Sequence, residues 1–355
     1  MPPREIGIAG AGLLGRLLAW RLAQACHRVS VFDPAPGPGP EFDGRQAAAF
    51  SAAGMLSPLA ERENSSERVA ALGWRSIALW RGVTAGLKAR PNFTVGGSLL
   101  LAHRNDLGMA RRVLARLAPE SAGAPRPEQL STAQLQALEP ALQGPAHAWL
   151  LPGEAHIDPV ATLQALQAEA GDVKWHWHCS VAGLQPGMLL FDGVPAQHFD
   201  LVFDVRGIGA RPALPVRGVR GEMVWLHAPN HGLTRPVRLL HPRHRLYLVP
   251  RKGDMVLAGA SEIESEDRSP VSLRSAVELM SAAHSVLPAL AEARIVRLDA
   301  NLRPALPDNE PNLHAEPGMV RINGLFRHGW LLAPALVEDA LLACGLVPAA
   351  GGIPA

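Results

Sequence analysis

The chain has 355 residues, enough for about two domains with substantial cores. With 48% hydrophobic and 19% charged residues, the composition is ordinary for a globular α/β enzyme and excludes a disordered chain. The formal net charge is only +2, and no basic stripe with interleaved aromatic residues is present, so the charge does not indicate a nucleic-acid-binding protein.

The composition also bears on location. No apolar run is long enough to span a bilayer, because Glu338 and Asp339 interrupt the Leu/Ala-rich stretch near the C-terminus. The cysteines Cys26, Cys179 and Cys344 are few, odd in number and scattered, which argues against a disulfide framework. The sequence therefore predicts a cytoplasmic protein.

The first motif is a glycine-rich loop between two predicted strands. Residues 5–9 and 28–32 are apolar enough for strands, and a Leu/Ala-rich helix is predicted over 13–25. The loop Gly10-Ala11-Gly12-Leu13-Leu14-Gly15 joins the first strand to the helix, and Asp33 follows the second strand, 23 positions after Gly10. A GxGxxG loop followed at about this distance by an acid predicts a dinucleotide site.

Each part of this motif has a physical reason. Gly10 permits the tight turn, Gly12 lets the backbone approach a pyrophosphate, and Gly15 allows helix and strand to pack closely. The free amides at the helix N-terminus attract phosphate, and the Asp33 carboxylate can hold a ribose.

The same segment has one alternative interpretation, a secretory signal peptide, since Ala23-Gln24-Ala25 resembles a cleavage site. Arg16 and Arg21 interrupt the uncharged apolar run that such a signal requires. The dinucleotide site is therefore the preferred interpretation.

The remaining elements follow from periodicity and capping signals. Helices are predicted over residues 66–89 and 105–117, from 132, over 158–170 and 271–287, and from 328. Strands are predicted over 93–101, 147–151, within 173–206, and over 220–227, 245–250, 254–260, 294–305 and 320–323. Proline-rich segments occupy 34–40 and 119–127.

This order predicts an α/β protein of two domains, because the first third alternates strand and helix while the middle consists mainly of strands. We expect a discontinuous Rossmann-like dinucleotide domain made of residues 1–90, 155–215 and 300–355. A mainly antiparallel β substrate domain would comprise 91–154 and 216–299.

A second glycine-containing junction lies near the C-terminus. Residues 324–334 follow the last predicted strand and open the last predicted helix, which makes another helix N-terminus able to accept an anionic group. One such site at each end of the chain suits a long cofactor such as a flavin dinucleotide, whose reduced ring carries negative charge. An ordinary capped helix is the alternative that the spacing leaves open.

Several further stretches carry a resemblance when taken in order. They are Ser51-Ala52-Ala53-Gly54-Met55-Leu56, His156-Ile157-Asp158-Pro159, Val216-Arg217-Gly218, Arg220-Gly221-Glu222, Tyr247-Leu248-Val249-Pro250-Arg251, Asn301-Leu302-Arg303-Pro304 with Pro307-Asp308, and Arg327-His328-Gly329. With the glycine loop they span nearly the whole chain. The chain resembles the FAD-dependent D-amino-acid oxidase/glycine oxidase family, most closely the glycine oxidases of thiamine biosynthesis.

The resemblance implies a two-domain flavoprotein with FAD as its cofactor and no metal. It implies that Asp33 holds the adenosine ribose, that Val181 touches the adenine side through its backbone, and that residues 325–331 wrap the isoalloxazine. The implied FAD-binding residues are Gly10, Gly12, Leu13, Leu14, Gly15, Asp33, Pro34, Ser51, Ala53, Gly54, Met55, Val181, Gly207, Leu325, Phe326, Arg327, His328, Gly329, Trp330 and Leu331.

The resemblance also implies the substrate-binding residues. Arg303 would grip the substrate carboxylate, Tyr247, which is the only tyrosine, would assist it, and Arg327 could serve either flavin or substrate. The implied reaction is oxidative deamination of glycine or a small amine by hydride transfer from Cα to flavin N5, with oxygen reduced to hydrogen peroxide. The imine product would supply iminoglycine for thiamine thiazole synthesis.

Three alternative functions remain beside this one. They are a D-amino-acid or N-methyl amino acid dehydrogenase that passes electrons to a quinone, an enzyme for a glycine-like amine carried on tRNA, and a non-catalytic flavin-binding protein. The weak positive charge argues against tRNA, and the presence of both Arg303 and Tyr247 argues against a non-catalytic protein. The partners are therefore expected to be a small amino acid, oxygen or a quinone, and a possible second copy of the chain, with no nucleic acid.

The sequence departs from the family pattern at Asp33 and at residues 204–209, and two further polar stretches have simple structural interpretations. Asp33 stands where related oxidases often carry Glu, and residues 204–209 replace a usually apolar stretch near the flavin. His176 and His178 would share one strand face, but a matching pair of metal ligands is missing nearby. Residues 262–268 are expected to form a solvated charged loop.

Overall fold

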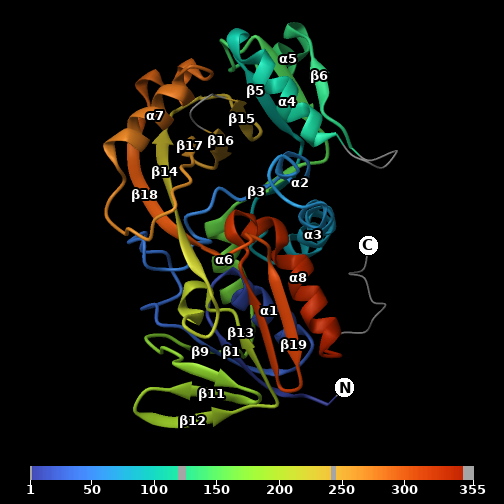
Figure 1. Cartoon of the computed structure of the whole chain (residues 1–355), viewed down its shortest axis with the longest axis vertical. Coiled ribbons are helices and arrows are strands. Elements are labelled where there is room, and N and C mark those ends of the chain that lie inside the picture. Colours follow the sequence, from blue (N-terminus) through green and yellow to red (C-terminus); the bar gives the residue numbers. More distant parts are fainter. Residues whose placement is uncertain (1, 119–124, 241–244, 347–355) are drawn as a thin grey trace.

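Two large sheets at opposite ends of an elongated molecule organise the computed structural model of the chain (Figure 1). It describes residues 2–118, 125–240 and 245–346, so part of the predicted proline-rich link at 119–127 lies outside the described residues. None of the helices in these ranges is long and apolar enough to cross a membrane. The predicted α/β class, with both parallel and antiparallel pairing, is confirmed.

The first sheet has six strands. Their bounds, in sheet order, are β19 (Asn312–Glu316), β20 (Met319–Asn323), β13 (Leu201–Asp204), β1 (Glu5–Ala9), β2 (Arg28–Phe32) and β9 (Lys174–His176). All neighbours pair in parallel except β19, which is an antiparallel edge. Ile6 and Ile8 are completely buried, as expected for a central strand covered on both faces.

Helices and a small hairpin sheet cover the six-stranded sheet. The helices are α1 (Leu13–Gln24), α3 (Glu67–Gly86), α6 (Pro159–Ala168) and α8 (Gly329–Ala343), and the three-stranded hairpin sheet consists of β10 (Gly183–Gln185), β11 (Met188–Phe191) and β12 (Val194–His198). Trp80 on α3 stacks on Trp330 of α8 with ring centroids 5.3 Å apart and donates from Nε1 to the Trp330 carbonyl at 2.8 Å. Helices far apart in sequence are thereby fixed to each other.

The second sheet has eight strands. In sheet order they are β18 (Arg294–Ala305), β14 (Arg217–His227), β17 (Met255–Gly259), β16 (Arg245–Arg251), β15 (Val237–Leu240), β5 (Ser98–Ala102), β7 (His147–Leu151) and β6 (Glu128–Leu130). Helix α7 (Leu273–His284) packs on one face, where Val224 and Leu248 meet Leu279 in a buried cluster. The opposite face bears Met223 and Tyr247 and turns toward the middle of the molecule.

Short elements connect the two sheets. They are a third sheet of β3 (Met55–Leu56), β8 (Ala155–Ile157) and β4 (Phe93–Val95), the helices α2 (Pro58–Glu61), α4 (Leu107–Leu117) and α5 (Thr132–Leu138), and the 3-10 turns η1 (Arg104–Asp106), η2 (Gly207–Ala210), η3 (Pro288–Glu292) and η4 (Phe326–His328). Asp158 caps α6 by accepting from the Ala161 amide at 3.0 Å, as the Asp-Pro pair predicts.

Two predicted strands differ from the structure. The single strand predicted over 93–101 is wrong, because Gly97 has φ +74° and breaks it into β4 and β5, which belong to different sheets. The strand at 175–179 ends at His176, which stacks on Phe32, while His178 lies in a turn with φ +53°. The two histidines therefore do not share a strand face.

The strands of the two large sheets come from different parts of the chain. The eight-stranded sheet takes its strands from 98–151 and 217–305, and the six-stranded sheet takes its strands from 5–32, 174–204 and 312–323. We propose that these two sheets mark the two domains. On this division β18 crosses from one domain to the other near residue 300.

Arg16 anchors three segments of the dinucleotide-binding half although it is only 1% exposed. Its Nε donates to the Ala11 carbonyl at 2.8 Å, Nη1 to Leu163 at 2.9 Å and Nη2 to Pro38 at 2.8 Å. Burial lowers the pKa of Arg16 to about 10, so the side chain remains protonated at neutral pH. Arg16, whose charge argues against a signal peptide, thus links α1 to α6 and to the proline-rich segment.

We expect Arg16→Ala to lower the free energy of unfolding by about 3 kcal/mol, since three buried carbonyls lose their donor and a cavity remains. Urea unfolding of both proteins measures the difference. Arg21→Ala on the same helix is the control, with an expected change below about 1 kcal/mol because Arg21 is only half-buried at the helix end. Equal losses in the two variants would contradict the anchoring role.

Candidate active site

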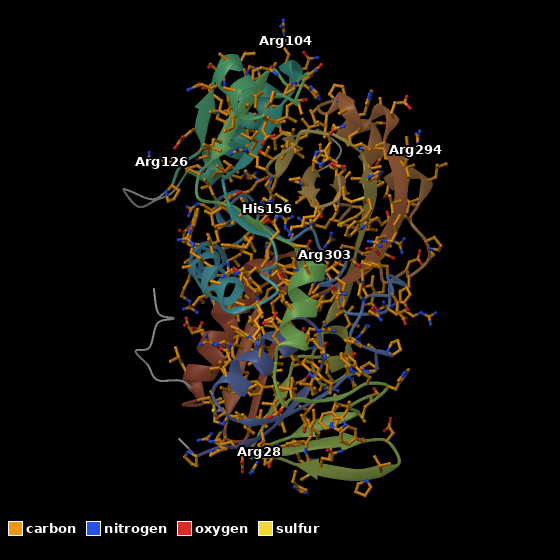
Figure 2. The ribbon with its side chains drawn as sticks, turned by 180° about the vertical axis from the view of Figure 1, so that it is seen from behind. Arg28, Arg104, Arg126, His156, Arg294 and Arg303 are labelled. Atoms are coloured by element: carbon orange, nitrogen blue, oxygen red, sulfur yellow. The ribbon has the colours of Figure 1, made fainter. Side chains whose placement is uncertain are left out.

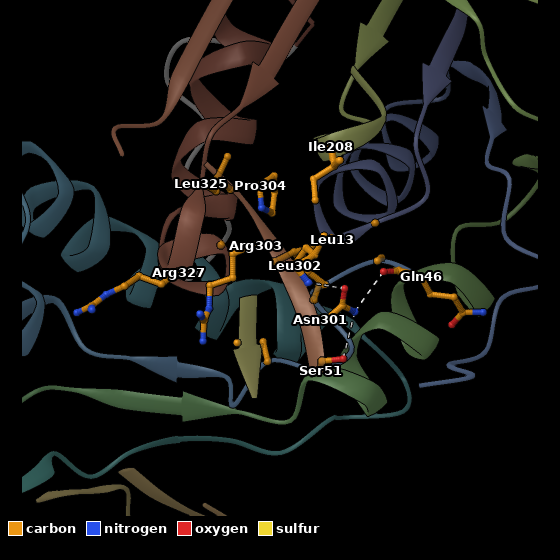
Figure 3. Close-up of a pocket in the computed structure, with 18 of the residues that line it drawn as sticks. Leu13, Gln46, Ser51, Ile208, Asn301, Leu302, Arg303, Pro304, Leu325 and Arg327 are labelled. Atoms are coloured by element: carbon orange, nitrogen blue, oxygen red, sulfur yellow. Dashed lines mark hydrogen bonds between the residues drawn. The ribbon is translucent and has the colours of Figure 1, made fainter. Parts of the chain in front are cut away.

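One continuous cavity of about 1390 Å³ lies between the two large sheets. It is larger than the roughly 300–1,000 Å³ usual for small-molecule sites and suits an elongated ligand together with a small second one. Figure 3 shows Arg303 and Arg327 on one side of this cavity, with Leu13, Asn301 and Gln46 toward the other.

The glycine loop forms a cradle at the carboxyl end of β1. A Cβ added to Gly15 would lie 1.9 Å from the Gly10 carbonyl oxygen, so only glycine allows α1 to pack this closely on the turn. Gly10 itself has φ +106°. A Cβ at Gly12 would meet only the Ala47 side chain, at 3.6 Å, which leaves the loop backbone open to the cavity.

The N-terminus of α1 is suited to a phosphate group. Its N-cap is Gly12, which has no side chain to accept from the first amides, and its first turn carries no acid. Those amides and the helix dipole therefore face the cavity with a partial positive charge. A pyrophosphate supplies the acceptors that these amides need.

Asp33 fixes the adjacent loops in place. Its Oδ2 accepts from the Ala11 amide at 2.6 Å and its Oδ1 from the Ala35 amide at 2.8 Å. Each carboxylate oxygen retains a further lone pair for a ribose hydroxyl. The acid predicted to hold the ribose is thus positioned by both the glycine loop and the segment after β2.

In the unusual stretch at 204–209, the two charged side chains bind each other. Asp204, which is 1% exposed, binds Arg206 through two hydrogen bonds of 2.9 and 2.8 Å, and Arg206 donates from Nη1 to the Val181 carbonyl at 2.8 Å. This pair stands where the resemblance led us to expect apolar residues, and the opposite charges of Asp204 and Arg206 neutralise each other. Asn323 donates to the carbonyl of Gly207 at 2.9 Å and ties the segment to β20.

The segment around Gly54 lines the centre of the cavity. Gly54 has φ +63°, and a Cβ there would lie 2.2 Å from the Ile157 carbonyl oxygen. Arg251 donates from Nη2 to the Ala53 carbonyl, and Asn301 donates from Nδ2 to the Ser51 hydroxyl at 3.3 Å. Two strands of the eight-stranded sheet, β16 and β18, therefore hold this segment against the cavity.

Arg303 lies over the backbone of β14 near the middle of the molecule (Figure 2). A Cβ on Gly221 would lie 2.3 Å from Nη2 of Arg303, so the glycine provides the space for the guanidinium. The guanidinium donates to the carbonyls of Ser261 at 3.1 Å and Arg220 at 3.4 Å, both of which are neutral. A half-buried cation whose acceptors are neutral is a strong binding group for a carboxylate.

Tyr247 stands beside Arg303 on the same face of the sheet. Its ring lies across Gly259, where an added Cβ would approach the ring to 2.9 Å, and its hydroxyl donates to Sδ of Met223 at 3.3 Å. Burial raises the pKa of Tyr247, so the phenol stays protonated and can donate a hydrogen bond to a carboxylate. Sulfur is a weak acceptor, which leaves this donor available to a ligand.

Arg327 belongs to an ion-pair cluster. Its Nη2 lies 2.6 Å from Oε2 of Glu61, its Nη1 lies 3.0 Å from Glu262, and Glu61 also pairs with Arg238 at 3.2 Å. Glu262 also lines the cavity, and it is exposed like most of residues 262–268, as expected for a solvated charged loop.

Most of the predicted site residues line the cavity. Those that do are Gly10, Gly12, Leu13, Leu14, Asp33, Pro34, Ser51, Ala53, Gly54, Met55, Val181, Gly207, Tyr247, Arg303, Leu325, Phe326, Arg327, Gly329 and Trp330. Three lie behind its wall: Gly15 is under the turn, His328 faces Glu61 and Ser65, and Leu331 is 2% exposed and packs against α3 at Gly73. Because η4 and α8 are helical, only some residues of the predicted 325–331 segment can face the cavity.

The comparisons with known proteins identify the chain. The profile of the family described as FAD dependent oxidoreductase matches residues 5–339. The chain belongs to this family. It is 37% identical over 337 residues to the putative thiamine biosynthesis oxidoreductase ThiO of Rhizobium etli, a match that covers 94% of each chain.

More distant relatives share the fold. The glycine oxidase of Geobacillus kaustophilus is 26% identical over 362 residues, covering 93% of this chain and 90% of the relative. The crystal structure of glycine oxidase from that organism superposes with a TM-score of 0.80 at 24% identity, covering 98% and 96% of the two chains. The structure of iminodiacetate oxidase from Chelativorans sp. superposes with a TM-score of 0.77 at 21% identity, covering 98% and 97%.

These findings confirm the resemblance, the fold class, the FAD cofactor and an oxidoreductase activity predicted from the sequence. The residues present fit FAD. A glycine cradle meets the N-terminus of α1, an acid lies at the ribose end, and the cavity continues from there to Tyr247 and Arg303.

Sequence analysis missed Glu61, Arg238 and Glu262. Glu61 follows the Ser51–Leu56 motif by five residues, but its partner Arg238 is 177 positions away on β15. No local pattern signals a charge pair of that separation, so only the fold could bring these residues together.

Gly15→Ala should reduce FAD binding and destabilise the fold, because its Cβ cannot fit 1.9 Å from the Gly10 oxygen. We expect at least about 2 kcal/mol less stability, measured by urea unfolding, and substoichiometric FAD in the purified protein by visible absorbance. Gly37→Ala is the matched control, since a Cβ there meets nothing within 4 Å. Full FAD content in the Gly15 variant would disprove the cradle.

Proposed function

We propose that the chain is a glycine oxidase-type enzyme that oxidises glycine or a similarly small amino acid or amine. The observation that carries the proposal is Arg303, a half-buried guanidinium in the cavity whose hydrogen bonds go to carbonyl groups. An α-amino acid offers the carboxylate that such a group binds through two parallel hydrogen bonds.

Tyr247 gives the bound carboxylate a direction. Its phenol is protonated, and it lies close enough to Arg303 for the guanidinium to affect its pKa. One ionic anchor and one directional donor fix the orientation of a small amino acid, and such positioning accounts for a large part of a rate enhancement. The apolar residues Met55 and Met223 line the same region and exclude water from it.

FAD, when bound, would supply the redox chemistry by accepting a hydride, that is two electrons and one proton, from the substrate carbon. We propose that the residues on the predicted list that line the cavity hold the cofactor and that Arg303 and Tyr247 hold the substrate. The substrate amine has to be neutral to release electrons, and an amine near the Arg303 charge, away from bulk water, favours the neutral form.

We further propose oxygen as the electron acceptor, with hydrogen peroxide as product, and iminoglycine for thiamine thiazole synthesis as the use of the imine. The relative in Rhizobium etli is described as a putative thiamine biosynthesis oxidoreductase, which supports this role. We also propose a cytoplasmic location, which Cys26, Cys179 and Cys344 support because all three are free thiols.

Anaerobic addition of glycine to the purified protein, followed by visible flavin absorbance, tests this function. We expect the absorbance to bleach and to return within seconds when air is admitted, with one hydrogen peroxide formed per glycine. A yellow protein that glycine does not bleach would contradict the substrate class. Bleaching without recovery in air would favour a different electron acceptor, such as a quinone.

Arg303→Ala should raise the apparent KM for glycine by about a hundredfold, since removing one partner of a buried charged hydrogen bond costs about 2–5 kcal/mol. Arg303→Lys should recover only part of this loss, because lysine cannot form the two-pronged contact. Steady-state kinetics with FAD content measured in parallel checks both. The control is Arg294→Ala, an exposed arginine on the same strand (Figure 2), which should leave KM unchanged.

Tyr247→Phe should raise KM about tenfold through loss of one hydrogen bond to a charged group. The folded pKa of Tyr247 is raised above its ordinary value of about 10, so the phenol is neutral throughout the assay range. The ratio of the KM values of variant and wild type should therefore stay constant between about pH 6 and pH 9. A ratio that changes with the ionisation of a phenol in this range would contradict the assigned role.

A further inference from the structure

Four charged side chains line the cavity near Arg303 and Tyr247, and only Arg327 among them is also a predicted cofactor-binding residue. They are Glu61 on α2, Arg238 on β15, Glu262 in the loop after β17 and Arg327 in η4. We call them the charged cluster. Their arrangement determines what net charge a substrate meets.

Glu61 is the centre of the charged cluster. It is 8% exposed, and its Oε2 accepts from Nη2 of Arg327 at 2.6 Å and from Nε at 3.0 Å. Its Oε1 accepts from Nη2 of Arg238 at 3.2 Å. One carboxylate thus engages two guanidinium groups.

Glu61 keeps its negative charge at neutral pH. Burial by itself would raise the pKa of Glu61, but the guanidinium groups of Arg327 and Arg238 outweigh burial and hold that pKa far below its usual range. Burial lowers the pKa of His328 to about 4, so the imidazole next to the cluster is neutral and adds no charge.

The position of Glu61 is fixed by a second, fully buried carboxyl group. Glu154 accepts from the Ala60 amide at 2.8 Å and from the Ser98 hydroxyl, which ties α2 to β5. Burial raises the pKa of Glu154. Because α2 is held at this point, the Glu61 charge cannot move away from an approaching anion.

Among Arg303 and the four members of the charged cluster, all of which lie in the described part of the chain, one cation is left without a carboxylate partner. Arg238 and Arg327 each bind a carboxylate of the charged cluster, whereas the hydrogen bonds of Arg303 go to neutral carbonyls. Three guanidinium groups face two carboxylates, so a single carboxylate of a substrate completes the neutralisation. A second one would be placed near Glu61 and Glu262 with no uncommitted guanidinium among these groups to receive it.

We propose that Glu61 determines substrate specificity by restricting the site to amino acids and amines with a single carboxylate. The residue neutralises Arg327 and Arg238, which would otherwise bind a second anionic group. This inference rests on the proposed function, since it assumes that Arg303 binds the substrate carboxylate.

Iminodiacetate and N-ethylglycine test the proposal. Both are achiral glycines of nearly equal size, and the second carboxylate of iminodiacetate is too close to the first to reach a distant part of the cavity. We expect FAD-loaded wild type to oxidise N-ethylglycine with a much higher kcat/KM than iminodiacetate. In Glu61→Gln, which keeps the shape and one acceptor, the ratio of kcat/KM for iminodiacetate to that for N-ethylglycine should rise by about tenfold or more.

Calorimetric titration of the same FAD-loaded proteins with malonate and propionate gives a readout that does not depend on turnover. Malonate should gain affinity relative to propionate in Glu61→Gln by a similar factor. Glu264→Gln is the matched control, because Glu264, two positions after Glu262, pairs with Arg217 at the start of β14 and does not line the cavity. Its ratios should equal those of wild type.

The outcomes separate this inference from the proposed function. Wild type that binds and oxidises glycine, with both ratios unchanged in Glu61→Gln, would overturn the role of Glu61 alone. Wild type that glycine does not reduce would overturn the proposed function instead. Should Glu61→Gln fail to fold, Arg238→Gln provides the test, since one positive charge fewer should lower both ratios several-fold, and unchanged ratios there would also reject the proposal.

Discussion

The pairing of β14 with β18 is the constraint on which the site depends. The two strands pair from Arg217 with Ala305 to His227 with Arg294, and the C-terminal half of β18 reaches the dinucleotide-binding half of the molecule. This pairing places Arg303 over Gly221 and Asn301 against the Ser51 segment. One strand therefore sets the distance between the surface that holds the cofactor and the surface that holds the substrate.

The interior of the molecule contains many arginines, and the fold satisfies them by different means. Arg16 is bound by carbonyls and Arg206 by a carboxylate two positions away. Arg327 is bound by Glu61, contributed by a distant segment. A guanidinium cannot lose its proton at physiological pH, so each burial requires acceptors. Arg303 lies in the cavity with neutral acceptors, which supports the proposal that it binds the substrate carboxylate.

The sequence predicted the parts of the site that depend on local backbone geometry. The glycine loop, Asp33 and the residues after β20 follow directly from strand–turn–helix patterns, whose glycines are required by contacts as short as that between Gly15 and the Gly10 oxygen. The family resemblance added Arg303 and Tyr247. The charged cluster was not predictable, because its pairs join residues far apart in the chain. The break at Gly97 was also missed. One long strand and two short strands in different sheets show the same alternation of apolar and polar residues.

Asp33 has a consequence for the thermodynamics of cofactor binding. Its carboxylate accepts from the amides of Ala11 and Ala35, so the chain itself orders the two loops that we propose receive the adenosine end of FAD. Ordering a loop costs conformational entropy, and a receptor whose loops are already ordered does not lose that entropy when the ligand arrives. Such preorganised loops favour tight cofactor binding, because ordering them takes little away from the free energy that the contacts contribute.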